Sequence, residues 1–449
     1  MNCRTAVRTA ASAALAMGAI LAGQQPPPAP VVLVTGARIL DAARGRYLAP
    51  AAILVEGDRI AAVTPGPPSP MPAVTAHVKA DGAVVVPGLL DAHAWGAPAP
   101  DLDADYFYLM GLAHGVTGYR VLNARTSWAV AQRARAAAGD VLAPRLWTSG
   151  RGINQGASPD RWLFDAPDAR AAAAEAARQV AAKVDWIAGY EALGPESYQA
   201  LAAAARQAGV RVSGRPGAAS MADLAAAGVA SIETLAFPLK ASAGPTDDSW
   251  PEVGARDLAA LQAGLLRRRV TLVPLMAAAA ARAFPEEALK DPSMALLPAA
   301  RRAALEARLS RTAADAPKRR RAWASQAAFL VRFVRAGGRV AAGTGFEFDG
   351  YPVPGGGVHR ELAAFVRAGL TPAEAIRAAT AAGSALVGAQ TGGAGLSAGA
   401  PADFFVVTGD PLTRIEDLSA ITHVVRAGEL LDPKALLALA RRGAEPKAK

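Results

Sequence analysis

A single histidine at the end of an apolar run is the clearest chemical feature of this sequence. Residues 84–96 read VVVPGLLDAHAWG, so Asp91 and Trp95 stand two positions before and after His93. Residues two apart on a strand point to the same side, so these three side chains are expected to share one face. An imidazole beside a carboxylate can bind a metal ion or move a proton.

Arginine and aromatic side chains follow other apolar runs and indicate a second kind of chemistry. In one interpretation, Arg120 and Arg215 bind the carboxylate or phosphate of a small-molecule ligand. Trp95 and Tyr190 would then form the walls of that pocket.

The alternative interpretation is an internal ion pair in place of a ligand. Arg215 would be its cation, and its candidate partners are Asp91, Glu233 and Glu347. In that case His93 is a hydrogen-bonded remnant, and the site has a structural role.

Eight apolar runs alternate with alanine-rich helical segments across the middle of the chain. They are AVVVPGLLDAH, GVTGYRVL, PRLWTSG, VDWIAGY, VRVSGR, ASIETLAF, VTLVPLM and GRVAAGTGF. Continuous apolar runs suit strands that are buried on both faces of a parallel sheet. Two capping pairs, Ser220 with Asp223 and Thr371 with Glu374, mark helix starts between or after them. The pattern predicts an α/β fold with a (β/α)8 TIM-like barrel, whose functional side chains lie at the carboxyl ends of the strands.

Short strands separated by turns flank this alternation on both sides. We therefore expect the barrel to occupy residues 85–395. Residues 31–84 and 396–432 together predict a small β-sandwich domain built from both chain ends. Residues 433–449 are expected to form a tail.

The first segment of the chain is typical of an exported protein. Residues 1–23 contain Arg4 and Arg8 before an apolar run that is too short to span a membrane, which predicts a signal peptide and a secreted or periplasmic location. The single cysteine, Cys3, lies in this segment, so the mature chain would have no disulfide or thiolate chemistry. No later apolar run reaches membrane-spanning length, so no membrane span is expected.

The chain is basic, with a formal net charge of +10. Its densest cluster, Lys318 to Arg321, is accompanied by no nucleic-acid-binding motif and is interpreted as a solvated helix face. Nucleic acid is therefore not an expected partner, although an acidic surface or polymer stays possible.

The order of several segments resembles the amidohydrolase superfamily, and its imidazolonepropionase-like branch in particular. The segments lie within residues 31–432 and are PGLLDAH, GVTGYR, AAKVDWIAGY, AGVASIET, AAGTG, HRELAAFVRAGLTPAEAIRAATAAGSALVG and ADFFVVTGDPL. The resemblance implies a hydrolase-like chain whose family chemistry is metal-dependent hydrolysis of C–N bonds in amides or cyclic amides. In that chemistry one or two divalent ions convert water to hydroxide near neutral pH.

The resemblance also implies six metal-ligand positions, of which only His93 keeps the family residue. The other five positions hold Trp95, Ala188, Arg215, Thr234 and Gly345. The family pattern has a histidine, a carboxylated lysine, two histidines and an aspartate there. A catalytic site usually needs three protein ligands, and a guanidinium repels a cation, so no metal cofactor is expected.

Three functions remain open at this stage. The first is a pseudoenzyme that binds a small molecule or a partner without hydrolysing it. The second is an active hydrolase with a divalent metal such as zinc and a rebuilt site formed by Asp91, His93, Glu347 and His359. The third is a regulatory subunit of an intact homologue, and a homo-oligomer is also possible. The ligand positions favour a catalytically inactive protein.

Overall fold

The computed structural model describes residues 30–94, 104–156, 162–235, 247–345, 353–388 and 395–444. The predicted signal peptide and the candidate site residues Trp95 and Glu347 lie outside these ranges. Within them, no helix is both long enough and apolar enough to cross a membrane.

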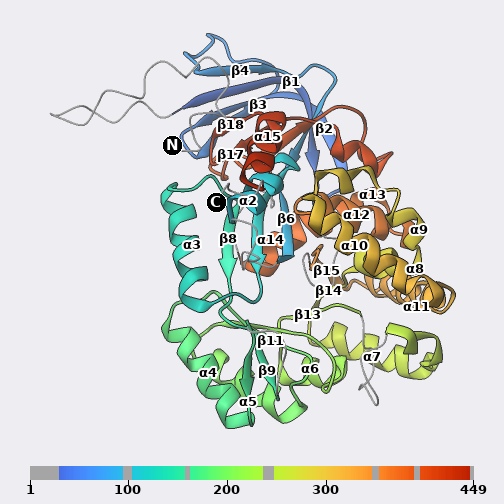
Figure 1. Ribbon diagram of the computed structural model, residues 1–449. Coiled ribbons are helices and arrows are strands. Elements are labelled where there is room, and N and C mark those ends of the chain that lie inside the picture. Colours follow the sequence, from blue (N-terminus) through green and yellow to red (C-terminus); the bar gives the residue numbers. More distant parts are fainter. Residues whose placement is uncertain are drawn as a thin grey trace.

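Parallel strands run through the centre of the molecule (Figure 1). They are β6 (Leu89–Ala94), β7 (Val116–Val121), β8 (Arg145–Thr148), β11 (Trp186–Gly189), β12 (Arg211–Gly214), β13 (Ser231–Glu233), β14 (Thr271–Val273) and β15 (Arg339–Val340). The first three form one sheet, and the other five form a second sheet in chain order. β9 (Ile153–Gln155) and β10 (Phe164–Ala166) extend the second sheet beyond β11. Each of the eight predicted runs contains one of the eight strands, so the predicted order of elements is confirmed.

Backbone hydrogen bonds connect the two parallel sheets at both of their edges. The Asp185 N–H donates to Thr148 O at 2.8 Å, which joins β8 to β11. The Ala92 N–H donates to Ala342 O at 2.8 Å, which joins β6 to the segment after β15. The carboxyl ends of all eight strands therefore lie on one side of the molecule.

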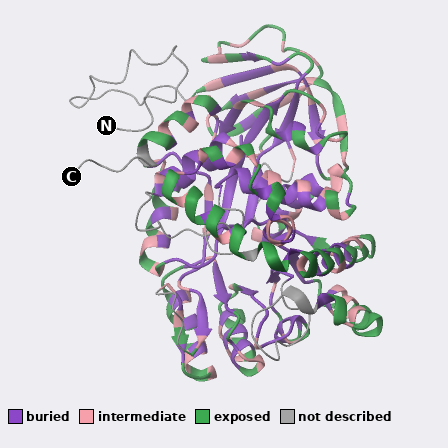
Figure 2. Cartoon of the chain, turned by 45° about the vertical axis from the view of Figure 1, so that its right-hand side comes forward, coloured by how far each residue is buried: buried purple, intermediate pink, exposed green. Residues whose placement is uncertain are grey.

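Helices pack on the outside of the parallel strands (Figure 1). They are α2 (Ala104–Ala113), α3 (Thr126–Ala138), α4 (Ala169–Ala181), α5 (Pro195–Gln207), α6 (Met221–Ala227), α7 (Ala255–Arg267), α8 (Met276–Ala283), α9 (Pro285–Ala288), α10 (Ala299–Thr312), α11 (Ala316–Arg335), α12 (Gly356–Ala368), α13 (Pro372–Ala379) and α14 (Ala381–Val387). The capping boxes predicted at Ser220 and Thr371 are present at the starts of α6 and α13. Figure 2 shows buried residues along the strands and exposed residues mainly on the outer helices.

The two chain ends meet in one further sheet, which we call the terminal sheet. Its strands are β1 (Val31–Asp41), β2 (Arg46–Glu56), β3 (Arg59–Thr64), β4 (Ala76–Lys79), β5 (Val84–Pro87), β16 (Phe404–Val407), β17 (Ile421–Arg426) and β18 (Glu429–Leu431). Most pairs are antiparallel, and β16 pairs with β5, so residues from both ends share one set of hydrogen bonds. The prediction of a unit made from both ends is therefore supported, as a single mostly antiparallel sheet.

The predicted tail is a helix for most of its length. α15 (Pro433–Ala444) packs against α2, and its residues Leu436 and Ala440 are fully buried. These two residues stand four apart, so they lie on one face of the helix. The helix was not predicted because the charged residues at the end of this segment are more prominent in the sequence than the apolar spacing.

Candidate functional site

Three buried side chains form a hydrogen-bonded chain where β6, β7 and β13 end. His93 Nδ1 lies 2.8 Å from Glu233 Oε2, and Arg120 Nη2 donates to Glu233 Oε1 at 2.7 Å. None of the three is more than 2% exposed. A carboxylate between two nitrogen donors in a dry interior is a strong local interaction, and it fixes the rotamers of both neighbours.

The Arg120 guanidinium is fully engaged by the protein. Its Nε donates to Ala92 O at 2.5 Å, and its Nη1 donates to Ser231 Oγ at 2.9 Å. Its Cζ lies 4.6 Å from the ring centroid of Trp186. The sequence suggested that Arg120 binds a ligand anion, but its complete burial and its contacts give it a structural role.

The charge on Glu233 determines the state of the imidazole. Burial opposes ionisation of Glu233, but Arg120 and the hydrogen bond from His93 outweigh burial, so its pKa is lowered. An ionised carboxylate only accepts hydrogen bonds, so His93 Nδ1 carries a proton and donates it. His93 Nε2 is buried and has no partner among the described residues.

Asp91 is not part of the hydrogen bonds among His93, Glu233 and Arg120. Its carboxylate instead bonds to residues in or next to both parallel sheets. Its Oδ1 accepts from the backbone N–H groups of His93 and Thr344, both at 3.0 Å. Its Oδ2 accepts from Thr344 Oγ1 at 2.5 Å. Burial raises the pKa of Asp91 despite these bonds. A Cβ on Gly343 would lie 2.7 Å from the Cβ of His93, so a glycine is needed for this close approach.

The other described metal-ligand positions supply no suitable ligand set. Ala188 has no donor atom, Thr234 and Gly345 replace stronger ligands, and Arg215 carries a fixed positive charge. Across the described residues, no group of three or more His, Cys, Asp or Glu side chains could hold a metal ion. The described side chains at these positions therefore do not supply the ligand set of a catalytic divalent ion.

Arg215 forms an ion pair with a carboxylate that was not among its predicted partners Asp91, Glu233 and Glu347. Its Nε lies 2.6 Å from Glu191 Oε2, on the loop after β11. The backbone of Arg215 is held by Tyr198, whose hydroxyl accepts from the Arg215 N–H at 3.0 Å. Glu233 is already bonded to Arg120 and His93, which explains the difference. The Arg215 side chain is 11% exposed and Glu191 is 47% exposed, so only the carboxylate side of this pair is open to solvent.

Tyr190, expected as a pocket wall, is 94% buried, and its hydroxyl donates to Leu122 O at 3.2 Å. The sequence analysis did not identify Ser231, Trp186 or Glu191 as contributors to the site. Ser231 was detectable, since it stands two residues before Glu233 and so shares a face with it. Ser231 Oγ also donates to Glu233 Oε1 at 2.5 Å.

His359 lies at the opposite ends of the strands from His93. Its Nε2 is 2.8 Å from His114 O, just before β7 begins, and its Nδ1 is 3.4 Å from Ser419 Oγ. His93, in contrast, is near the carboxyl end of β6. The structure therefore does not bring His359 into the site that the sequence suggested, because the start of α12 packs toward the terminal sheet.

Acidification is expected to destabilise the protein through His359. Burial, with a smaller contribution from His114, lowers the pKa of His359 from 6.5 to about 4. Between pH 6.5 and pH 4 this histidine binds a proton in the unfolded chain but not in the folded chain. The free energy of unfolding therefore has its full value above pH 6.5 and decreases as the pH falls toward 4. The full loss is about 3 kcal/mol. Urea denaturation of wild type and His359→Gln between these pH values measures it.

The variant should lose less stability on acidification than wild type. The exposed His77 provides a matched control, and His77→Gln should keep the wild-type slope. Equal slopes in wild type and His359→Gln would show that His359 is not the group responsible.

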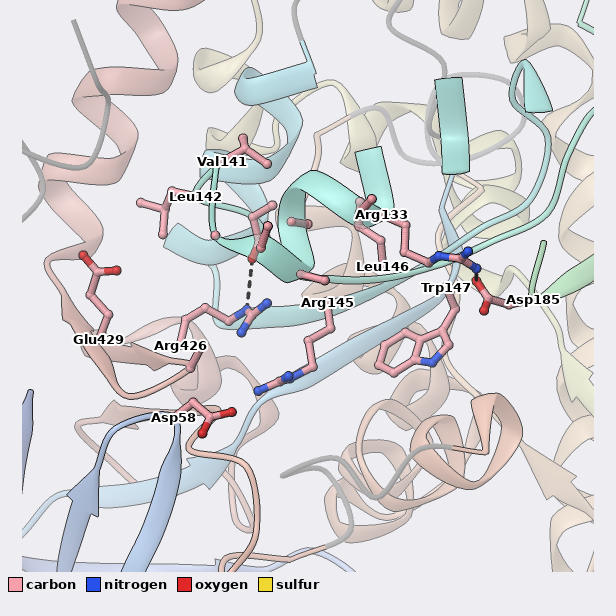
Figure 3. Close-up of a pocket in the computed structure, with 17 residues that line it drawn as sticks. Asp58, Arg133, Val141, Leu142, Arg145, Leu146, Trp147, Asp185, Arg426 and Glu429 are labelled. Atoms are coloured by element: carbon pink, nitrogen blue, oxygen red, sulfur yellow. Dashed lines mark hydrogen bonds and ion pairs between the residues drawn. The ribbon is translucent and has the colours of Figure 1, made fainter. Parts of the chain in front are cut away.

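A cavity of about 490 Å³ lies between α3, β8 and the terminal sheet (Figure 3). Its charged lining residues are Asp58, Arg133, Arg145, Asp185, Arg426 and Glu429. Arg133 pairs with Asp185 at 2.5 Å, and both Arg145 and Arg426 pair with the buried Asp403. Because Arg145 begins β8, this cavity is at the amino ends of the strands, away from His93. Arg145 and Arg426, through Asp403, connect the parallel strands to the terminal sheet.

Solved structures share this arrangement, although no protein-family model and no curated protein matches the chain. Bottromycin amidohydrolase is 22% identical with a TM-score of 0.72, over 92% of this chain and 90% of that chain. A putative prolidase from Bifidobacterium longum is 22% identical with a TM-score of 0.70, over 92% and 100%. A Xaa-Pro dipeptidase with bound methionine in the active site is 17% identical with a TM-score of 0.67, over 90% and 100%.

These similarities establish the fold at low sequence identity. One of the matched structures is an amidohydrolase by its name, the class that the sequence segments resemble.

Proposed function

We propose that this chain is an amidohydrolase-superfamily protein that has lost metal-dependent hydrolysis and binds a small molecule instead. The eight parallel strands would form a closed (β/α)8 barrel, with the ligand at their carboxyl ends. The observation that carries the proposal is the series of hydrogen bonds from Arg120 through Glu233 to His93. These bonds engage His93, which is the one metal-ligand residue that the sequence retains.

Electrostatics supports the loss of the metal. An ion at His93 Nε2 would have one imidazole ligand from the described residues, while Glu233 is already saturated by Arg120, Ser231 and His93. Lowering the pKa of water from about 16 to about 7 requires about 12 kcal/mol of differential stabilisation. One imidazole next to the ion pair of Arg120 and Glu233 does not supply the charge that holds such an ion.

The metal content of the purified full chain tests this proposal. After incubation with zinc or manganese and removal of free ions, we expect far less than one ion per chain by mass spectrometry. His93→Ala should not change that value. One tightly bound ion per chain that is lost in His93→Ala would overturn the proposal.

The unpartnered His93 Nε2 favours a second candidate, a hydrolase with a rebuilt site. Glu233 would orient the imidazole, and Nε2 would accept a proton from a water molecule. Turnover of amide substrates by wild type, abolished by His93→Gln, would establish this alternative. We expect no turnover above that of the variant.

We also propose that the ligand carries a carboxylate, which Arg215 binds. Arg215 lies just beyond the carboxyl end of β12, and its partner Glu191 is half-exposed and able to move aside. A peptide-like ligand is consistent with the matched Xaa-Pro dipeptidase that contains methionine.

Arg215→Gln is expected to weaken binding of such a ligand by about tenfold or more, since a charge-assisted hydrogen bond contributes about 1.5–3 kcal/mol. Isothermal titration with methionyl-proline and with methionine measures the change. Arg206→Gln, on the exposed side of α5, is the control and should bind like wild type. Absence of binding to the wild-type chain would reject this ligand class while leaving the metal proposal intact.

Export is part of the proposed function. Residues 1–23 combine Arg4 and Arg8 with an apolar run, which supports a secreted or periplasmic location. The amino-terminal sequence of the protein recovered outside the cytoplasm tests this, and an uncut chain retained inside cells would reject it.

A further inference from the structure

Two buried hydrogen-bond donors lie beside one small cavity and have no partner among the described residues. They are Arg319 Nη1 and Trp323 Nε1, both on α11. The cavity between α8 and α11 is lined by Ala279, Arg282, Arg319, Ala322, Trp323 and Gln326. Trp323 is more than nine-tenths buried, so its N–H cannot turn to bulk water.

The chemistry of these groups defines what can enter. Guanidinium and indole N–H groups only donate, so the occupant must accept hydrogen bonds. A buried donor without an acceptor costs about 1–3 kcal/mol, so two of them at one cavity favour an occupant that serves both. A water molecule would bring two hydrogens of its own, and among the lining side chains only Gln326 carries an acceptor oxygen.

The surroundings are positively charged. Arg282, on α8, approaches Arg308, on α10, closely enough that burial and this like charge together lower the pKa of Arg308. Arg319 itself has an ion pair only with the exposed Asp315, at 3.6 Å, among the described residues. Residues 299–321 contain eight Arg or Lys and two Asp or Glu, so they carry +6 of the net charge of +10.

We propose that this cavity is a binding site for a tetrahedral oxyanion, phosphate or sulfate. One oxygen enters the cavity, whose volume of about 10 Å³ is close to that of a single bound water molecule, and accepts from Arg319 Nη1 and Trp323 Nε1. The remaining oxygens face the basic surface formed by α10 and the start of α11. The site is independent of the function proposed for the carboxyl ends of the strands.

Titration of the full chain with inorganic phosphate and with sulfate tests the site. Isothermal titration at constant ionic strength, with chloride as the balancing anion, is expected to show saturable binding of one oxyanion per chain. Arg319→Gln should weaken that binding about tenfold or more, because it removes a charge-assisted bond. Trp323→Phe should weaken it severalfold, because it removes one N–H while keeping the aromatic packing on Phe284.

Arg332→Gln is the matched control, since Arg332 is an exposed cation on the same helix, lies outside residues 299–321 and does not line the cavity. It should bind phosphate like wild type. Melting temperatures without phosphate establish that each variant is folded. Equal weakening in all three variants, unchanged binding in Arg319→Gln and Trp323→Phe, or no saturable binding by wild type would each overturn the proposal.

Discussion

Glu233→Ala is expected to lower the free energy of unfolding by about 3–5 kcal/mol, as for other broken buried ion pairs. The substitution leaves Arg120 charged and fully buried, and it removes the partner of His93 Nδ1. Urea denaturation near neutral pH measures this loss. Glu286→Ala, which breaks the exposed ion pair with Arg320, is the control and should cost about 1 kcal/mol or less.

Replacement of both Arg120 and Glu233 distinguishes the cost of an unpaired buried charge from the cost of lost packing. The double variant Arg120→Met with Glu233→Leu removes both charges and keeps apolar volume, so it should recover much of the stability lost in Glu233→Ala. A loss below about 1 kcal/mol in Glu233→Ala would mean that the interior tolerates an unpaired guanidinium. The prediction that the hydrogen bonds among Arg120, Glu233 and His93 stabilise the protein would then be wrong.

Stability and chemistry are linked at these residues. In a metal site the ion provides the charge that opposes buried carboxylates, whereas here Arg120 provides it within the protein. His93 is consequently held by Glu233 whether or not a ligand is present. A site stabilised in this way keeps its fold without a cofactor, as the proposed loss of metal-dependent hydrolysis requires.

The order of strands and helices was predictable from the sequence because it depends on local patterns. Apolar runs locate strands, and the capping residues Ser220 and Thr371 start helices in the structure as expected. Those signals involve neighbours within a few residues and need no knowledge of the tertiary fold.

The partners of the site residues were less predictable because they depend on contacts distant in sequence. Glu233 was one of the carboxylates expected to pair with Arg215, but in the structure Arg120, on β7, holds that carboxylate and Arg215 pairs with Glu191. Pairing patterns among several buried arginines and carboxylates follow from rotamers and distances, which strand order alone does not give. His359 illustrates the same limit, since a helix start can pack toward either end of the strands.

A second buried carboxylate, Asp403, joins the two chain ends to the parallel strands. It accepts from Arg145 Nε at 2.5 Å, from Arg426 Nη1 at 3.4 Å and from the Ala427 N–H at 2.8 Å. Arg145 begins β8, and Arg426 ends β17. The Asp403 side chain therefore connects elements that are far apart in the sequence, since Arg145 and Asp403 are 258 residues apart.

Asp403→Ala should therefore cost about 3–5 kcal/mol of unfolding free energy, because it leaves Arg426 buried without its carboxylate. Denaturation in urea, followed by circular dichroism, gives the value. Glu287→Ala breaks the exposed pair with Arg367 and serves as the control, with an expected loss of about 1 kcal/mol or less. Equal losses in the two variants would show that Asp403 contributes no more than a surface ion pair. A large loss of unfolding free energy in Asp403→Ala alone would show that this carboxylate stabilises the contact between the terminal sheet and the parallel strands.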